Sequence, residues 1–238
     1  MNTFSVLILT APPPGFPTPA KSADAPIAGP YVKIDGREAI VRSAELFLNR
    51  DNVKQIQVAF LPEDVEEGKR KYGGHFGFSG IKVVSGGPRW MDQCIAGAAK
   101  IIDEATHVII HDSARPAVPY SDIDALMEAA EKKPIAALSS PCRDGLIALD
   151  EGGNPIAFHS SKEFVNLLTP QVFKKDKFLT MTQSKLETHA SQFHLVPGSY
   201  LNMRINSSQD AQLVKAMINM LPKPKIKPLN SPFDEAQW

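Results

Sequence analysis

The chain is poor in cysteine, has no net charge and contains no long apolar run. Its two cysteines, Cys94 and Cys142, have neither a Cys-x-x-Cys nor a Cys/His spacing, which argues against a disulfide scaffold or a zinc site and favours a cytoplasmic location. Lys plus Arg and Asp plus Glu both number 26, so no overall field attracts nucleic acid or lipid. FSVLILT is too short to span a bilayer. We therefore expect no nucleic-acid partner and no membrane contact.

Apolar segments of two periodicities alternate along the chain. The continuous run from Phe4 to Thr10 predicts a strand that helices cover on both faces, at the centre of a sheet. Further strands are expected over 55–60, 81–84, 107–111 and 135–139, and helices over 38–49, 91–102 and 122–131. This alternation predicts an α/β fold whose sheet is mostly parallel.

The second half of the sequence contains a predicted hairpin and a predicted last helix. Two short apolar runs flank DEGGNP, which suits a chain reversal, so we expect a β-hairpin arm near 146–160. Ser207 precedes Asp210 at capping-box spacing and begins a helix that reaches about Leu221. The predicted organisation is one domain over 1–222 and a flexible tail over 223–238.

Proline is concentrated after the first strand. Seven prolines lie between Ala11 and Pro30, which excludes a regular helix and predicts a long loop. A proline nitrogen carries no hydrogen, so these residues cannot contribute N–H groups to a phosphate-binding nest.

The stretch THVIIHDSARP joins an apolar strand to charged residues. Ligands of open α/β sheets bind at the carboxyl ends of the strands, where Asp112 and Arg115 are expected. A carboxylate there suits Mg²⁺ and an arginine suits a phosphate. The alternative is structural, because Asp112 is also suited to cap the turn and to pair with Arg115.

Five segments in collinear order resemble one enzyme family. HDSARP resembles its HDAARP signature, and the other four are LILTA, SGGPRWMDQCIAG, LLTPQVF and GSYLNMRINSSQDAQLV. On these motifs the chain is identified as a divergent member of the 2-C-methyl-D-erythritol 4-phosphate cytidylyltransferase family, which is related to the ribitol-phosphate cytidylyltransferases. The resemblance implies a Rossmann-like nucleotidyltransferase fold, a three-layer sandwich that forms homodimers through the arm.

The resemblance also implies a reaction and a set of site residues. A cytidylyltransferase joins CTP to a polyol phosphate, releases pyrophosphate and requires a divalent metal, Mg²⁺. Asp112 matches the metal ligand, and the catalytic set is Asp112, Arg115 and Lys21. Residues expected at the nucleotide are Ala11, Gly15, Gly86, Gly87, Arg89 and Asp92, and residues expected at the polyol phosphate are Arg143, Asp144, Thr169 and Arg204.

Several positions depart from the family pattern. TAPPPGFPTPAKSADAPIAGP stands where the family has a glycine-rich loop, and its catalytic lysine is missing in register. Pro88 and Gln93 replace an acidic residue and a serine. Two hypotheses follow: a divergent cytidylyltransferase, or a catalytically degenerate member that binds nucleotide weakly or serves as a partner. Replacing Asp112 is expected to abolish metal-dependent nucleotide binding and to leave thermal unfolding nearly unchanged.

Two other residue types are interpreted more simply. His107 and His111 flank a buried strand, and such histidines are more often satisfied structural groups than ligands. Trp90 follows the paired glycines, where an indole either stacks on a base or packs in the core.

Overall fold

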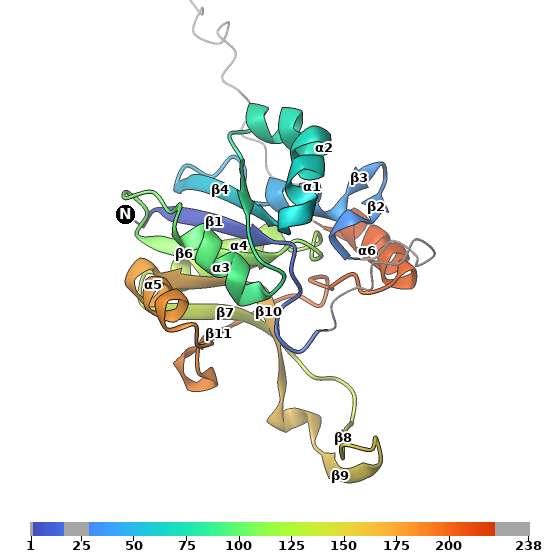
Figure 1. Cartoon of the computed structure of the whole chain (residues 1–238). Helices are drawn as coiled ribbons and strands as arrows, with labels where there is room; N and C mark the ends of the chain where they lie inside the picture. Colours follow the sequence, from blue (N-terminus) through green and yellow to red (C-terminus); the bar gives the residue numbers. More distant parts are fainter. Residues whose placement is uncertain (1, 17–28, 222–238) are drawn as a thin grey trace, which may run out of the picture.

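The computed structural model describes residues 2–16 and 29–221, which form a seven-stranded sheet covered by helices (Figure 1). In spatial order the strands are β11 (His194–Pro197), β7 (Ile135–Pro141), β10 (Val165–Lys174), β6 (His107–Asp112), β1 (Phe4–Leu9), β4 (Val53–Phe60) and β5 (Lys82–Ser85). All neighbouring pairs are parallel except those of β10, which runs antiparallel to β6 and β7. The α/β fold class with a mostly parallel sheet is confirmed.

Helices cover both faces of the sheet. They are α1 (Ala39–Glu45), α2 (Val65–Phe78), α3 (Trp90–Ala98), α4 (Tyr120–Ala129), α5 (Lys175–Ser184) and α6 (Ser208–Met220). Along β1, Val6 and Ile8 join a core with α1, α2 and α4, whereas Leu7 and Leu9 join a second core with α3 and α5. Successive side chains of a strand point to opposite faces. The buried apolar run of β1 thus fixes three layers with β1 inside the sheet.

Smaller elements complete the body. β2 (Lys33–Ile34) and β3 (Arg37–Glu38) pair with each other, and α6 packs with β2 through a third apolar core. Single 3-10 turns are η1 (Gly29–Tyr31), η2 (Pro62–Asp64), η3 (Ser161–Glu163) and η4 (Ala190–Gln192). Residues 17–28 of the proline-rich loop and the predicted tail over 223–238 lie outside the described residues.

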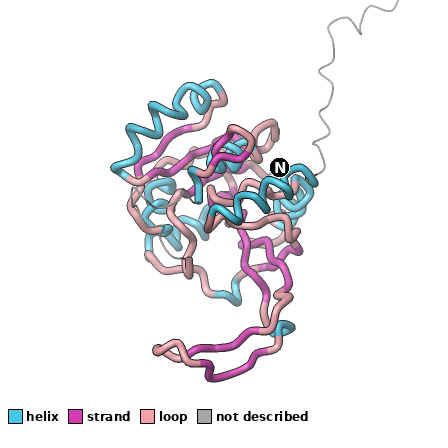
Figure 2. Tube along the Cα trace, turned by 90° about the vertical axis from the view of Figure 1, so that its right-hand side faces the viewer, coloured by secondary structure: helices cyan, strands magenta, loops and turns pink. Residues whose placement is uncertain are grey.

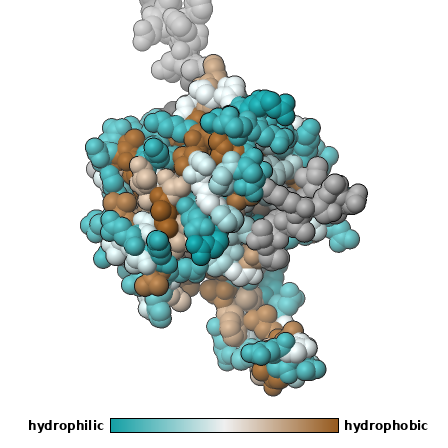
Figure 3. Space-filling model, viewed as in Figure 1, coloured by the Kyte–Doolittle hydropathy of each residue, from teal (hydrophilic) through white to brown (hydrophobic). Residues whose placement is uncertain are grey.

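A hairpin leaves the body of the molecule, as the sequence predicts. β8 (Leu146–Leu149) pairs antiparallel with β9 (Pro155–His159), and the ribbon projects away from the main sheet (Figures 1 and 2). The Asp150 side chain accepts the backbone N–H groups of Gly152 and Asn154, and Gly153 adopts φ +82°, so the turn between the strands is made by local bonds. Apolar side chains gather on this arm (Figure 3).

The boundaries of the helices differ from those predicted. Helix α1 ends at Glu45 rather than 49, and α3 ends at Ala98 rather than 102. Helix α6 begins as predicted, because the Ser207 hydroxyl accepts the Asp210 N–H and the Asp210 carboxylate accepts the Ser207 N–H. Within the part of the chain that the structure describes, no helix has the length and apolar character needed to cross a membrane.

Candidate functional site

One buried carboxylate lies between two buried arginines at the carboxyl end of β6. The Asp112 side chain is 1% exposed, and its Oδ2 lies 2.7 Å from Arg204 Nε and 3.7 Å from Arg115 Nε. Its Oδ1 accepts the Ala114 N–H at 2.9 Å. The turn and the Asp112–Arg115 pair of the structural interpretation are therefore present, and Arg204 adds a second, closer ion pair.

Backbone groups from three segments fix these side chains. Arg115 donates through Nη1 to the Asn202 carbonyl at 2.7 Å, and the Asn202 amide donates to the Thr169 carbonyl at 2.7 Å. Arg204 follows in the same loop between β11 and α6, and its Nη1 reaches Asn206 Oδ1 at 2.5 Å. Burial lowers the pKa of Arg115, and the Asp112 carboxylate opposes that shift. The loop of Asn202 is thus tied to both β6 and β10.

His111 connects the same segments from within the sheet. Its Nε2 lies 3.1 Å from the Arg115 carbonyl, which only accepts, so Nε2 carries the hydrogen. Burial lowers the pKa of His111 to about 3, which keeps the ring neutral. Nδ1 then accepts from the Thr169 hydroxyl at 3.1 Å, and that hydroxyl accepts the Asp112 N–H at 3.1 Å. The structural role expected for His111 is confirmed.

The carboxylate of Asp112 does not fit a protein-held magnesium site. Mg²⁺ takes near-octahedral oxygen ligands, whereas both Asp112 oxygens receive protein N–H groups and the side chain is closed to solvent. No group of three or more acidic, histidine or cysteine side chains that could hold a metal occurs in residues 2–16 and 29–221. In this arrangement Asp112 does not fit the role of metal ligand that the resemblance implies.

The first five residues of the loop after β1, 10–14, have no free backbone N–H group. Gln93 is fully buried on α3, and its Oε1 accepts the N–H groups of Thr10 and Ala11 at 2.9 and 3.0 Å. Its amide donates to the Thr10 hydroxyl at 3.1 Å. Pro12, Pro13 and Pro14 follow and carry no N–H. Ala11, predicted at the nucleotide, is therefore bonded to Gln93 and is buried.

Gly15 and Phe16 end the described part of this loop. Gly15 adopts φ +85°, which suits glycine, and the Phe16 N–H closes a turn onto the Pro13 carbonyl at 3.1 Å. The Arg204 guanidinium lies 5.0 Å from the centre of the Phe16 ring. Lys21, predicted to be catalytic, lies outside the described residues.

The predicted nucleotide residues around α3 contact one another. Arg89 binds Asp92 with two hydrogen bonds, Nε to Oδ2 at 2.9 Å and Nη2 to Oδ1 at 2.8 Å. This exposed pair lowers the pKa of Asp92 and caps the start of α3. A Cβ at Gly86 would lie 2.8 Å from the Gln93 side chain, and one at Gly87 would lie 2.6 Å from that of Asp92. Both glycines are thus required by close packing.

The residues predicted to bind the polyol phosphate lie in two separate parts of the structure. Thr169 joins Asp112, Arg115 and Arg204 in the buried cluster. Arg143 and Asp144 are exposed at the root of the arm, where the Arg143 guanidinium lies 3.3 Å from the centre of the Tyr200 ring.

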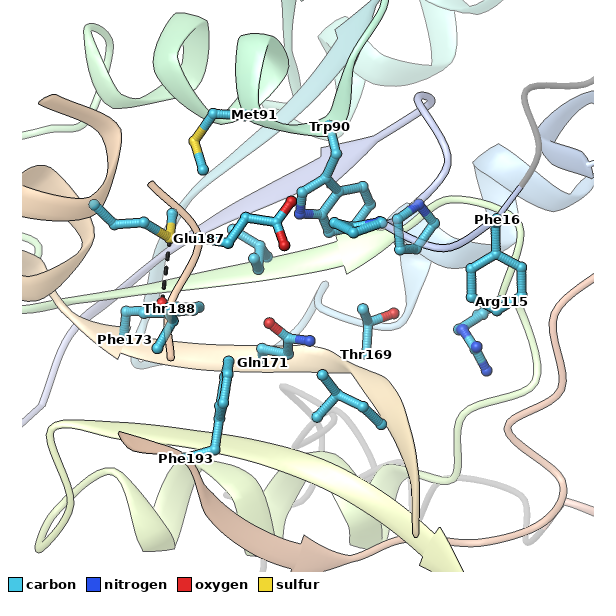
Figure 4. Close-up of a pocket in the computed structure, with 15 residues that line it drawn as sticks. Phe16, Trp90, Met91, Arg115, Thr169, Gln171, Phe173, Glu187, Thr188 and Phe193 are labelled. Carbon is cyan, nitrogen blue, oxygen red and sulfur yellow. Dashed lines mark hydrogen bonds between the residues drawn. The ribbon is translucent and has the colours of Figure 1, made fainter. Parts of the chain in front are cut away.

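A cavity of about 160 Å³ lies beside the buried cluster (Figure 4). Ten of its fifteen lining residues are apolar, including Pro13, Phe16, Trp90, Phe173 and Phe193. Arg115 and Thr169 line it on the side of the cluster, and Glu187 lies toward Trp90 and Met91. Trp90, for which two interpretations were open, both packs in the core beside Cys94 and forms a wall of this cavity.

Asn202 and Gln93 were not predicted as organisers of the site. The sequence holds a signal for Asn202, because it lies in the matched segment GSYLNMRIN. Gln93 also lies in a matched segment, SGGPRWMDQCIAG, but its partners lie 82 and 83 positions away and are not visible in the sequence.

Over most of its length the chain is similar to proteins of one family. The family model of 2-C-methyl-D-erythritol 4-phosphate cytidylyltransferase matches residues 21–220. Curated relatives with that name include one from Clostridioides difficile, 25% identical over 80% of this chain and 85% of the relative, and one from Photobacterium profundum, 30% identical over 60% and 69%.

Solved structures agree on the fold. The 2-C-methyl-D-erythritol 4-phosphate cytidylyltransferase from Thermus thermophilus superposes with a TM-score of 0.69, at 23% identity over 92% of this chain and all of the other. A 4-diphosphocytidyl-2C-methyl-D-erythritol synthase from Anaerococcus prevotii reaches 0.72 at 17% identity, over 92% and 96%. With the three-layer fold, the arm and the matched segments in place, the chain belongs to the 2-C-methyl-D-erythritol 4-phosphate cytidylyltransferase family.

Proposed function

We propose that this chain transfers a cytidylyl group from CTP to a polyol phosphate of the methylerythritol-phosphate type. A phosphate oxygen of the acceptor attacks the α-phosphorus of CTP and forms the new P–O bond. The bond from the α-phosphorus to the oxygen that bridges to the β-phosphorus breaks, and pyrophosphate leaves with the electron pair. The family match over residues 21–220 supports this proposal.

The charge of the buried cluster is the structural observation that carries it. In the described part of the chain, the guanidinium groups of Arg115 and Arg204 are both paired with one carboxylate, that of Asp112. One positive charge in excess is therefore held at the carboxyl ends of β1 and β6, beside a cavity. Buried charges are normally balanced, so this cluster favours an anion such as a phosphate group.

The protein's contribution to such a reaction is positioning and positive charge. Arg115 and Arg204 are held by Asp112 and by the Asn202 loop, so they need no reorganisation when an anion arrives. The Thr169 hydroxyl at the same end of the sheet donates to His111 and accepts the Asp112 N–H, so it positions the cluster.

The second candidate, a catalytically degenerate binding protein, is favoured by the loop after β1. Between Thr10 and Pro14 the two N–H groups are taken by Gln93 and the three prolines have none. This part of the loop offers no backbone donor to a triphosphate, although helix N-termini and backbone nests are the usual phosphate sites.

Turnover distinguishes the two candidates. The full chain is incubated with CTP, methylerythritol phosphate and Mg²⁺, and pyrophosphate release is measured beside calorimetric titration with CTP. We expect release that falls about a hundredfold or more in Arg204→Gln, because one preorganised charge is lost, and that is unchanged in Arg37→Gln on the exposed β3. No release and no nucleotide binding at millimolar concentration would instead support the degenerate candidate. The Mg²⁺ requirement and the cytoplasmic location stay predictions.

The proposal includes a homodimer formed through the arm. Ile147, Leu149, Ile156 and Phe158 are 59 to 76% exposed on the two arm strands, and a two-stranded hairpin with exposed apolar residues gains stability by packing on another surface. A second copy of the chain supplies such a surface symmetrically.

The oligomeric state tests this part. Sedimentation equilibrium of the full chain should report a dimer, and Phe158→Ser should raise its dissociation constant at least about tenfold, as expected for a buried aromatic anchor. Phe78→Ser is the matched control, because Phe78 is 95% exposed on α2 of the body. A dimer that Phe78→Ser weakens and Phe158→Ser leaves intact would show that the interface lies elsewhere.

A further inference from the structure

Tyr200 lies in the loop between β11 and α6, between two residues that are tied to the body of the molecule. The Ser199 N–H donates to Asp122 Oδ2 on α4 at 2.6 Å, and the Asn202 amide donates to the Thr169 carbonyl on β10 at 2.7 Å. The backbone on either side of Tyr200 is therefore fixed, and its ring has a defined place on the surface.

The Tyr200 ring lies against the Arg143 guanidinium. The guanidinium carbon is 3.3 Å from the centre of the ring. A guanidinium that stood edge-on at this distance would overlap the ring, so its plane lies along the ring face, as arginines stack on aromatic rings. The N–H groups of a guanidinium lie in its plane, so they stay at the edge of the stack. An arginine held in this way keeps its donors for an anion.

The contact orders a side chain that has little other support. Arg143 is exposed between the end of β7 and the start of β8, at the root of the arm, and Tyr200 is 40% exposed. A long side chain on such a segment samples many rotamers, and this freedom is lost when it binds a ligand. The ring restricts Arg143 before a ligand arrives, so less freedom is lost on binding.

The contact also connects the two parts of the structure that hold the residues predicted to bind the polyol phosphate. Arg143 belongs to the part at the arm, whereas Thr169 and Arg204 belong to the buried cluster. Tyr200 precedes Arg204 by four residues in one loop, and the Arg204 Nε lies 2.7 Å from Asp112 Oδ2. One short segment thus contacts the cation at the arm root and supplies a cation of the cluster.

We propose that Tyr200 is a positioning residue, whose ring holds the Arg143 guanidinium in a fixed place relative to Arg204 for the phosphate of the acceptor. The effect of Tyr200 passes through Arg143, and Tyr200 itself contacts no reacting group. This inference rests on the proposed cytidylyltransferase function, because the acceptor phosphate is a substrate of that reaction.

Steady-state kinetics of the full chain test the role of the ring. Tyr200→Leu removes the ring and keeps an apolar side chain, and Tyr200→Phe keeps the ring without the hydroxyl. We expect Tyr200→Leu to raise the KM for methylerythritol phosphate about two- to fivefold, as for the loss of an exposed cation–π contact, and to leave kcat and the KM for CTP unchanged. Tyr200→Phe should match the parent chain, and so should Phe78→Leu on exposed α2. An unchanged KM in Tyr200→Leu, or an equal rise in Tyr200→Phe, overturns the proposal.

A double variant tests whether Tyr200 acts through Arg143. Arg143→Gln should raise the KM for methylerythritol phosphate at least as much as Tyr200→Leu does. In the Arg143→Gln chain, adding Tyr200→Leu should change the KM no further, because residues that act through one contact are not additive. Additive effects of the two substitutions would contradict the assignment.

Trypsin digestion of the folded chain tests the contact without turnover. Trypsin binds the side chain of the residue after which it cleaves, so a stacked Arg143 is protected. We expect cleavage after Arg143 to be about two- to fivefold faster in Tyr200→Leu than in the parent chain or Tyr200→Phe. Cleavage after the exposed Lys185 in the same digest should be unchanged. Equal cleavage after Arg143 in all three chains overturns the proposal. Protection of Arg143 in a chain that releases no pyrophosphate would instead support the contact and reject the proposed activity.

Discussion

The two sides of the candidate site, one after β6 and one after β1, differ in how they use their polar groups. On the β6 side, Asp112, Arg115 and Arg204 form buried ion pairs that fall in segments resembling the family motifs. On the β1 side, prolines replace N–H groups and Gln93 takes the two N–H groups that remain before them. The first side thus retains positive charge, and residues 10–14 of the second offer no backbone N–H group to a triphosphate.

This difference shows why a signature motif can persist without its full partner set. The charged residues after β6 bind one another and the backbone of the Asn202 loop, so the fold itself requires them. A phosphate-binding loop has no comparable structural role, and its N–H groups are free to be lost. The HDSARP motif therefore indicates the fold more strongly than it indicates turnover.

Removing the carboxylate on the β6 side should have the largest effect. Asp112→Asn leaves two buried guanidinium groups without a charged partner, and we expect the free energy of unfolding to fall by about 3–5 kcal/mol. This replaces the expectation from sequence that thermal unfolding would be nearly unchanged. Urea unfolding measures it, with Asp103→Asn on the exposed surface as control. A loss below about 1 kcal/mol would contradict the structural role given to the β6 side, because the cluster would then not stabilise the fold.

Restoring donors on the β1 side should have an intermediate effect. Replacing Pro12, Pro13 and Pro14 together by glycine returns three N–H groups to the loop. We expect the affinity for CTP to rise about tenfold, since a hydrogen bond to a charged group contributes about 1.5–3 kcal/mol and ordering glycine costs part of it. Calorimetry measures the change, and Pro62→Gly at the exposed start of η2 is the control. Unchanged affinity would show that lost donors do not limit nucleotide binding.

Acid should slightly lower the free energy of unfolding through His111, which lies on the β6 side. Its pKa is about 3 in the folded chain and about 6.5 when unfolded. Above pH 6.5 both states hold a neutral ring, and below it the unfolded chain takes up a proton that the folded chain refuses. His111 therefore lowers the free energy of unfolding as the pH falls from 6.5 toward 3, by about 1 kcal/mol between pH 6 and 5.

The variant His111→Asn should remove that part of the pH dependence, and His194→Asn on exposed β11 should keep it. Urea unfolding at pH 6 and pH 5 gives the comparison. If both variants showed the slope of the parent chain, His111 would not be the group that gives this pH dependence.

Much of the fold was predictable because burial on both faces produces long apolar runs. β1, β4, β6 and β7 all lie within two residues of their predicted positions. Helix α2 was not predicted, because four of its fourteen residues are glycines, which disfavour helix by about 1 kcal/mol each. Its first glycine, Gly68, packs against the Phe60 ring, where a Cβ would lie 2.9 Å away. Tertiary packing thus overrides propensity at α2.

The site was predictable only where its residues follow strands. Asp112 and Arg115 come directly after a buried run, and Thr169 and Arg204 lie in recognisable segments. The bonds of Asp112 to Thr169 and to Arg204 join residues 57 and 92 positions apart, and a sequence does not state them. The pair of Asp112 with Arg115 was foreseen as the structural alternative, whereas the closer pair with Arg204, which leaves Asp112 unsuited to a metal, was not visible in the spacing.

Strand β10 connects the arm to the buried cluster. It leaves the arm at Val165, enters the sheet between β7 and β6, and carries Thr169 four residues later, about 13 Å along the strand. Its pairing with β7 is interrupted between Leu167 and Gln171, and its pairing with β6 begins at Gln171, so Thr169 lies in an irregular stretch of the strand, where its hydroxyl contacts His111 and Asp112. The arm and the hydroxyl that contacts the charged cluster are thus separated by only four residues of one strand, so a displacement of the arm has a short covalent route to Asp112.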